Sequence, residues 1–107
     1  MKLRILESAD AVNDVISTAN YISAHTDLNT SDRFLEAIKG AYHQIAENPG
    51  IGTLRDYGQP DLQGMRMWRV SEFPRTLIFY LAAEPDLLIF RVLNGTMNIN
   101  EIFGFPG

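Results

Sequence analysis

The sequence predicts an α+β domain with an N-terminal strand, a helical hairpin and then a three-stranded antiparallel meander. Two observations lead to this prediction. Apolar residues recur at helical spacing over residues 9–47, whereas strand patterns dominate residues 64–94, so helices and strands occupy separate parts of the chain. A length of 107 residues with 46% hydrophobic residues indicates a single domain over residues 1–107.

The first two elements follow from alternation and capping. Residues 2–7, KLRILE, alternate polar and apolar, which is typical of a short strand with one buried face. Ser8 is placed to cap a helix whose first turn carries Asp10, where a carboxylate suits the positive end of the helix dipole. An apolar stripe extends this helix to His25. The stripe consists of Val12, Val15, Ile16, Ala19 and Ile22.

A second helix is expected after the polar segment DLNTSDRF, with Asn29 or Thr30 as its cap. It ends at Asn48-Pro49-Gly50, because a residue before proline disfavours helix and glycine accepts unusual dihedral angles. A short loop between two helices makes a helical hairpin. Residues 49–63 are rich in glycine and proline and are expected to form a loop. The second apolar stripe consists of Phe34, Ile38, Ala41, Tyr42 and Ile45.

Three strand patterns follow, at residues 64–73, 75–83 and 86–94. The middle one, RTLIFYLAA, is apolar nearly throughout, which indicates a central strand covered on both faces. Turns at Phe73-Pro74 and Glu84-Pro85-Asp86 make the three strands an antiparallel meander. The hairpin is expected to cover one sheet face, and the other face is expected to carry Trp68, Arg69 or Arg91. The tail INEIFGFPG is expected to form one helical turn that packs Ile99, Ile102 and Phe103.

Composition excludes several classes of protein. The chain has no cysteine, which excludes disulfides, thiolate zinc sites and a cysteine nucleophile. It has no apolar run long enough for a membrane helix and no signal-peptide pattern, so we expect a cytoplasmic protein without a membrane partner. A net charge of −4 lacks the basic excess of general nucleic-acid binders. A local basic patch is still possible, because residues 62–82 contain three arginines (Arg66, Arg69 and Arg75) and one acidic residue, Glu72.

Motifs of catalysis do not occur in the sequence. There is no phosphate-binding glycine loop, dinucleotide motif, zinc-protease helix or nucleophile elbow. His25 and His43 lie on different helices and have no third ligand, so we expect neither a metal nor another cofactor. The candidate functional groups that remain are arginines and aromatics on the meander. They either bind a partner, or the aromatics belong to the core and the arginines to a solvent-exposed face. Arg91 interrupts an apolar strand, where a charge is costly unless it is paired. Its expected partners are Glu7, Glu72 or Glu84.

The order of several short motifs resembles the RelE/ParE superfamily of toxins, often called plasmid stabilisation proteins. The segments LQGMRMWRVSEFPRTLIFY and LLIFRVLNGTMNI resemble its ParE-like branch, so the resemblance covers nearly the whole chain and implies the fold described above. The motifs of the first half are Tyr21-Ile22, RFLEAI at 33–38, and Asn48-Pro49 followed by Gly52 and Arg55.

The resemblance implies the toxin of a type II toxin–antitoxin pair, silenced by a cognate antitoxin that forms an oligomer with it. ParE-like members are associated with inhibition of DNA gyrase, and nucleic acid would be contacted only indirectly, through the antitoxin. RelE-like members instead cut messenger RNA on the ribosome, with an arginine after the last strand and a tyrosine in the tail. Here the matching positions are Met97 and Phe103, which can neither stabilise a phosphate nor move a proton, so an enzyme is disfavoured.

The last loop also departs from the ParE-like pattern. Where that branch has histidine and then arginine-aspartate, this chain has Asn94 and then Met97-Asn98, while Arg91 and Gly95 are retained. Three functions therefore stay open: a ParE-like toxin with a protein target, a RelE-type ribosome-dependent endonuclease, and a non-toxic module that binds the antitoxin. No catalytic residue is assigned. The candidates for binding a target or the antitoxin are Arg66, Trp68, Arg69, Arg75, Arg91, Asn94 and Met97.

Overall fold

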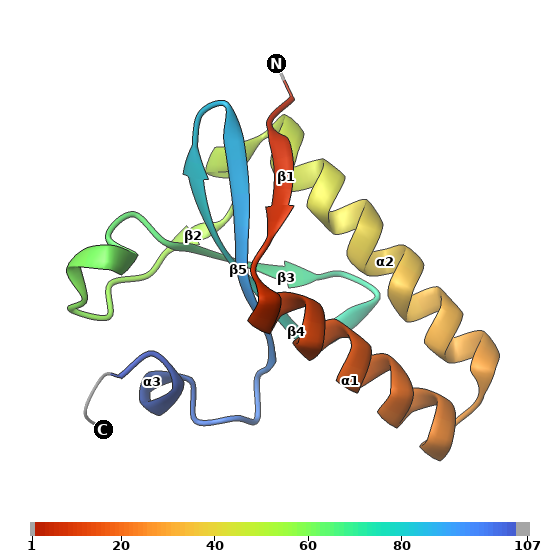
Figure 1. Ribbon diagram of the computed structural model, residues 1–107. Coiled ribbons are helices and arrows are strands. Elements are labelled where there is room, and N and C mark those ends of the chain that lie inside the picture. The colour runs from red at the N-terminus through yellow and green to blue at the C-terminus, as the bar shows by residue number, and fades with distance from the viewer. Residues whose placement is uncertain (1, 105–107) are drawn as a thin grey trace.

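The computed structural model describes residues 2–104, so the last three residues of the expected tail segment lie outside it (Figure 1). The predicted order of elements is confirmed: a strand, two helices and an antiparallel meander. Short 3₁₀ turns at Pro49–Ile51 and Pro60–Leu62 flank one further strand, β2. The elements are β1 (Arg4–Glu7), α1 (Ala9–His25), α2 (Leu28–Glu47), β2 (Thr53–Leu54), β3 (Arg66–Val70), β4 (Phe73–Ala83), β5 (Asp86–Asn94) and α3 (Ile99–Ile102).

The five strands form one mixed sheet in the order β1-β5-β4-β3-β2. β3, β4 and β5 form the predicted antiparallel meander, and β1 pairs in parallel with β5, with Ile5 opposite Leu87. The sequence did not predict β2, which lies inside the expected loop and pairs only with Met67 and Arg66 of β3. Two residues are too few to show an alternating pattern.

The helix ends follow the side chains that cap them. Ser8 Oγ accepts a hydrogen bond from Ala11 N at 3.0 Å, and α1 ends at His25, as predicted. The expected cap of α2 is wrong: Asp27 caps it, with Oδ1 accepting from Thr30 N at 2.6 Å. Asp27 has extended backbone and follows α1 after a single residue, so the helix begins earlier than the polar segment suggested. Asn48 ends α2 before Pro49, as predicted.

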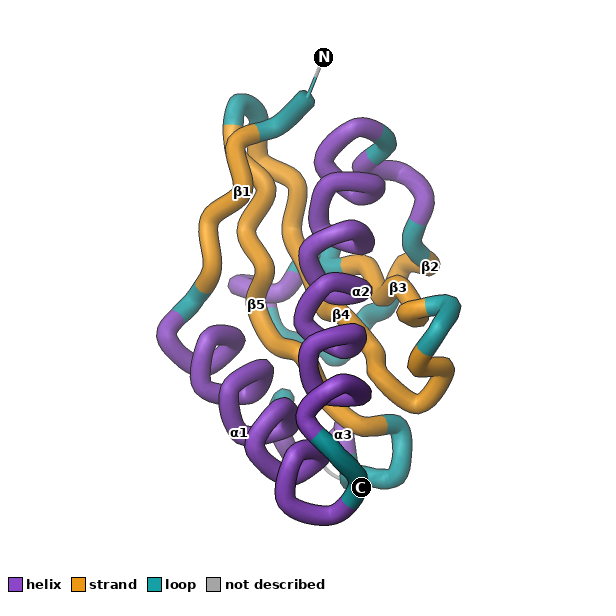
Figure 2. Tube along the Cα trace, turned by 90° about the vertical axis from the view of Figure 1, so that its right-hand side faces the viewer, coloured by secondary structure: helices purple, strands orange, loops and turns teal. Residues whose placement is uncertain are grey.

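The hairpin of α1 and α2 covers one face of the sheet (Figure 2). All five residues of the predicted α2 stripe are buried there, together with Ile78, Tyr80, Leu87 and Ile89 from the central strands. Ser31 Oγ donates to Ala19 O at 2.8 Å and ties the two helices together. The α1 stripe is narrower than predicted, since Val12 and Ile16 are 39% and 53% exposed.

The opposite face is a second apolar core. Of the three residues expected there, the prediction for Trp68 is wrong, whereas Arg69 lies opposite Leu77 of this face and Arg91 lines a hollow with Leu62 and Phe103. Successive residues of β4 point to opposite faces, and the loop from β2 to β3 and the α3 segment cover this side (Figure 1). Trp68 packs with the helix-side core instead. In the tail, Phe103 is buried and Ile99 packs beside it, but Ile102 is 38% exposed, contrary to expectation. The buried residues of this face are Leu62, Met65, Leu77, Phe79, Leu93 and Phe103.

No helix within residues 2–104 combines the length and the apolar character needed to cross a membrane.

Candidate functional site

Arg66 lies where β3 meets the loop before β2, and its contacts hold that loop. Its Nη1 donates to Gly52 O at 2.7 Å and to Gly50 O at 3.4 Å. Beside it, the Tyr80 hydroxyl donates to Pro49 O at 2.7 Å and accepts from Gly52 N at 2.9 Å. Burial raises the pKa of the Tyr80 hydroxyl above its usual value. Arg66 is thus committed to backbone carbonyls of its own chain.

Arg91 is paired with Asp14 on α1, not with Glu7, Glu72 or Glu84 as expected. Its Nε and Nη2 donate to the two Asp14 oxygens at 2.8 and 2.9 Å, and Asp14 Oδ2 also accepts from Val92 N at 3.0 Å. These hydrogen bonds to Asp14 raise the pKa of the Arg91 guanidinium. Since α1 packs across β5, a helix residue far away in sequence reaches this strand. Arg91 therefore pins α1 to the sheet.

Arg69, Arg75 and Asn94 gather at the end of the sheet where the β3–β4 turn meets the end of β5. The Arg69 guanidinium donates to Pro74 O across the turn. Gly95 N donates to Arg75 O at 2.7 Å, which joins the loop after β5 to the same turn. Both arginines and Asn94 are exposed. The structure thus brings together three of the seven candidates.

Asn94 and Met97 shape the loop that follows β5. Asn94 Oδ1 accepts from Thr96 N at 2.9 Å and from Thr96 Oγ1 at 2.8 Å, an Asx turn that closes the loop on itself. Met97 N donates to Asn94 O at 3.0 Å, and the Met97 side chain is 48% exposed. Within residues 2–104 no strand follows Asn94-Gly95, as expected. Met97 therefore offers apolar contact surface in the loop after β5.

A hollow of about 330 Å³, here named the Tyr21 hollow, adjoins this cluster. Sequence reasoning did not propose Tyr21 as a site residue, yet its ring is 63% exposed and stacks on His25 with centroids 4.0 Å apart. The sequence does contain a signal for this exposure, because Tyr21 lies beside the apolar stripe of α1 and not within it. Tyrosine is enriched at protein interfaces, so an exposed tyrosine that lines a hollow is a candidate contact residue. The lining of the Tyr21 hollow includes Tyr21, Ile22, Phe73, Arg75, Thr76 and Asn94.

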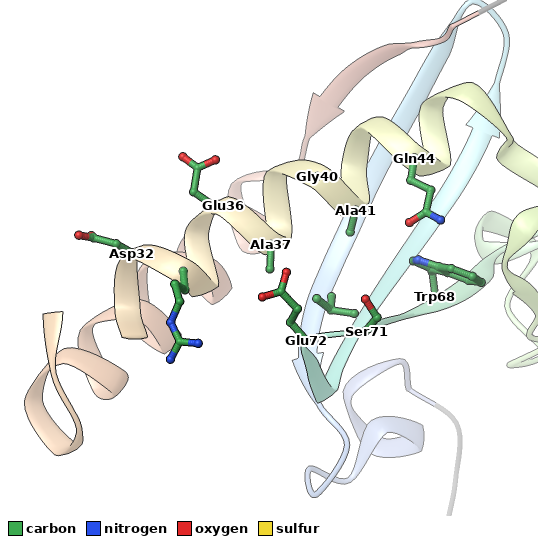
Figure 3. Close-up of a pocket in the computed structure, with 11 residues that line it drawn as sticks. Asp32, Glu36, Ala37, Gly40, Ala41, Gln44, Trp68, Ser71 and Glu72 are labelled. Carbon is green, nitrogen blue, oxygen red and sulfur yellow. The ribbon is translucent and has the colours of Figure 1, made fainter. Parts of the chain in front are cut away.

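A second hollow of about 390 Å³, here named the α2 groove, lies between α2 and the β3–β4 turn (Figure 3). Trp68 lines it, so this candidate lies apart from Asn94 and Met97. Figure 3 shows Trp68, Ser71 and Glu72 pointing toward α2. Glu72 borders both hollows, which therefore adjoin at the β3–β4 turn. The lining of the α2 groove includes Asp32, Glu36, Ala37, Gly40, Trp68 and Glu72.

The positions that would serve RNA cleavage carry no suitable chemistry. Met97 has no ionisable group, and Phe103 is 6% exposed, with its ring 4.9 Å from those of both Tyr57 and Phe79. Within residues 2–104, no three His, Cys, Asp or Glu side chains converge where they could hold a metal ion.

Comparison with known proteins agrees with this fold. The family model described as the ParE toxin of the type II toxin–antitoxin system parDE matches residues 5–99. A solved structure titled as the chromosomal ParDE TA system from P. aeruginosa is similar, with a TM-score of 0.71 at 11% identity, over 87% of this chain and 96% of that one. No curated protein matched the sequence. Because the family model spans most of its length, the chain belongs to the ParE toxins of type II toxin–antitoxin systems.

Proposed function

We propose that this ParE-family toxin acts by binding a protein target, such as DNA gyrase, and that a cognate antitoxin neutralises it. The observation that carries the proposal is the Tyr21 hollow. It combines an exposed tyrosine with Arg75 and Asn94, and Arg69 lies at the same turn. Tyrosine and arginine are enriched among the residues that dominate protein–protein binding energy. The hollow also adjoins the loop after β5, where the ParE resemblance implies functional groups.

Electrostatics favours a protein target over ribosomal RNA. The chain carries a net charge of −4, whereas binding to the nucleic-acid backbone gains much of its affinity from lysine and arginine that neutralise phosphates. Arg66 and Arg91 are also occupied, by backbone carbonyls and by Asp14. Arg69 and Arg75 remain at the exposed end of the sheet, beside apolar side chains. Two cations beside an aromatic hollow suit an acidic or polar protein surface.

Induction without the antitoxin tests the proposal. We expect growth arrest with filamentation, and the purified protein should inhibit DNA supercoiling by gyrase. Growth arrest with normal supercoiling activity would support the assignment as a toxin but exclude gyrase as its target. Cleaved messages at mapped transcript ends would instead establish the RelE-type ribonuclease.

A non-toxic module that binds the antitoxin is the second candidate function. It is supported by the loop after β5. In this loop the Asn94 side-chain oxygen accepts hydrogen bonds from Thr96, and Met97 carries no charge. This alternative predicts antitoxin binding without any growth defect. The growth curve after induction separates it from the first proposal.

A further inference from the structure

The α2 groove has a floor of small residues. Ala37, Gly40 and Ala41 face it from α2, and a Cβ built on Gly40 would meet nothing within 4 Å. From Asp32 to Gln44 the lined stretch of α2 is about 18 Å long, at 1.5 Å per residue. Small side chains along one helix allow another helix to pack its ridge closely against them. The floor therefore has the shape to take a helix running along α2.

Three carboxylates surround the groove, and none forms an ion pair within residues 2–104. Asp32 and Glu36 extend from α2, while Glu72 points toward α2 from the β3–β4 turn (Figure 3). The cation that lines the groove, Arg33, donates to Thr30 Oγ1 at 3.4 Å. The groove thus carries unpaired negative charge that an incoming cation would complement.

Trp68 forms an apolar wall of the groove. It is the single tryptophan of the chain and is half-buried against the helix-side core. In the described part of the chain its indole N–H has no hydrogen-bond acceptor, so it is free to donate to a partner. An exposed indole face also attracts lysine and arginine head groups. Trp68 and the carboxylates therefore select for the same kind of side chain.

We propose that the α2 groove is the docking site for a lysine- or arginine-bearing amphipathic helix of the antitoxin. The identity of the partner rests on the proposed function, whereas its cationic chemistry rests on the groove. A second copy of this chain fits poorly, because each copy carries a net charge of −4 and would bring the same carboxylates. A segment that folds on binding can cover such a groove completely.

Fluorescence of Trp68 provides a direct readout of the groove. The probes are two synthetic helices of about 18 residues, one of alanine and lysine and one with every lysine replaced by glutamate. We expect a saturable change in emission with the lysine peptide, weakened by salt, and no change with the glutamate peptide. An unchanged emission with the lysine peptide up to millimolar concentration would overturn the proposal.

Matched variants locate the binding. Glu72→Lys and Gly40→Leu should each weaken binding of the lysine peptide by at least about tenfold, through charge reversal and through filling of the floor. Glu47→Lys carries the same charge change on α2 outside the groove lining and should stay within about twofold of wild type. Equal losses in Glu72→Lys and Glu47→Lys would place the binding elsewhere. Circular dichroism checks that each variant is folded.

The antitoxin itself separates this inference from the proposed function. The protein encoded by the neighbouring reading frame is co-expressed with wild type and with Gly40→Leu. We expect Gly40→Leu to remain toxic and to lose rescue. Full rescue of a toxic, folded Gly40→Leu variant would contradict the inference. If the wild-type protein is not toxic, the proposed function is refuted, but the inference about the groove is not. The Trp68 fluorescence titrations with the two peptides still test it.

Discussion

Among single residues, Arg91 and Arg69 differ in what their side chains contact. Arg91 interrupts an apolar strand, and its bidentate pair with Asp14 makes it a structural link between β5 and α1. Within residues 2–104 the exposed Arg69 side chain makes one hydrogen bond, to Pro74 O. The two arginines should therefore respond differently to substitution.

Replacing Arg91 with alanine leaves Asp14, whose side chain is 11% exposed, without its cation. We expect Arg91→Ala to lower the free energy of unfolding by about 2 kcal/mol, because a mostly buried carboxylate loses a charged hydrogen-bond partner. Arg69→Ala is the control and should stay within about 0.5 kcal/mol of wild type. Urea denaturation of both variants measures this. If Arg91→Ala is as stable as wild type, the Arg91–Asp14 ion pair does not stabilise the fold.

At the scale of elements, the short β2 strand depends on a clamp from β4. The Tyr80 hydroxyl bridges Pro49 O and Gly52 N, and Arg66 holds Gly52 O from β3. A side chain at Gly52 has no room, since its Cβ would lie 2.6 Å from the Tyr80 hydroxyl and 2.9 Å from Met67 O. Together with the contact of Arg66 to Gly50 O, four hydrogen bonds made by these two side chains fix the backbone of the loop before β2 to the sheet.

Removal of the clamp should loosen this loop. Tyr80→Phe loses both hydroxyl contacts, so we expect a loss of about 1–2 kcal/mol in unfolding free energy and faster amide hydrogen exchange at residues 50–54. Gly52→Ala should cost at least as much through the steric clash. Gly50→Ala in the same turn is the matched control, because its Cβ meets nothing within 4 Å. A neutral Gly52→Ala would show that the loop can move aside without cost.

Local periodicity accounts for how much of the elements could be predicted. Around β3, Met65 and Met67 pack in one core and Trp68 and Val70 in the other, which the alternation of residues along a strand explains. The parallel pairing of β1 with β5 left no local mark, since either strand pattern fits several neighbours. The pairing of Arg91 with Asp14 likewise depends on how α1 crosses β5, which the local pattern does not encode.

In the molecule as a whole, the two cores cover the two faces of β4, and the two hollows adjoin at the β3–β4 turn. The apolar run of β4 predicts a strand covered on both faces, but most of what covers the second face could not be predicted, because a loop without periodicity supplies it together with the α3 segment. Of the candidate residues, the structure brings Arg69, Arg75 and Asn94 together, whereas the Tyr21 hollow and the α2 groove arise from packing of the hairpin. Because Glu72 borders both hollows, we expect an antitoxin in the α2 groove to hinder access to the Tyr21 hollow.

Growth after induction of Tyr21→Ala tests whether the Tyr21 hollow carries the proposed toxicity. The ring is exposed, so the variant should fold with nearly unchanged stability, while loss of an aromatic contact residue weakens target binding by about 2 kcal/mol, or about thirtyfold. Leu54→Ala is the control, since it truncates an apolar side chain that is 59% exposed on β2. We expect normal growth with folded Tyr21→Ala and growth arrest with wild type and Leu54→Ala. Arrest by Tyr21→Ala as complete as that by wild type would contradict this expectation.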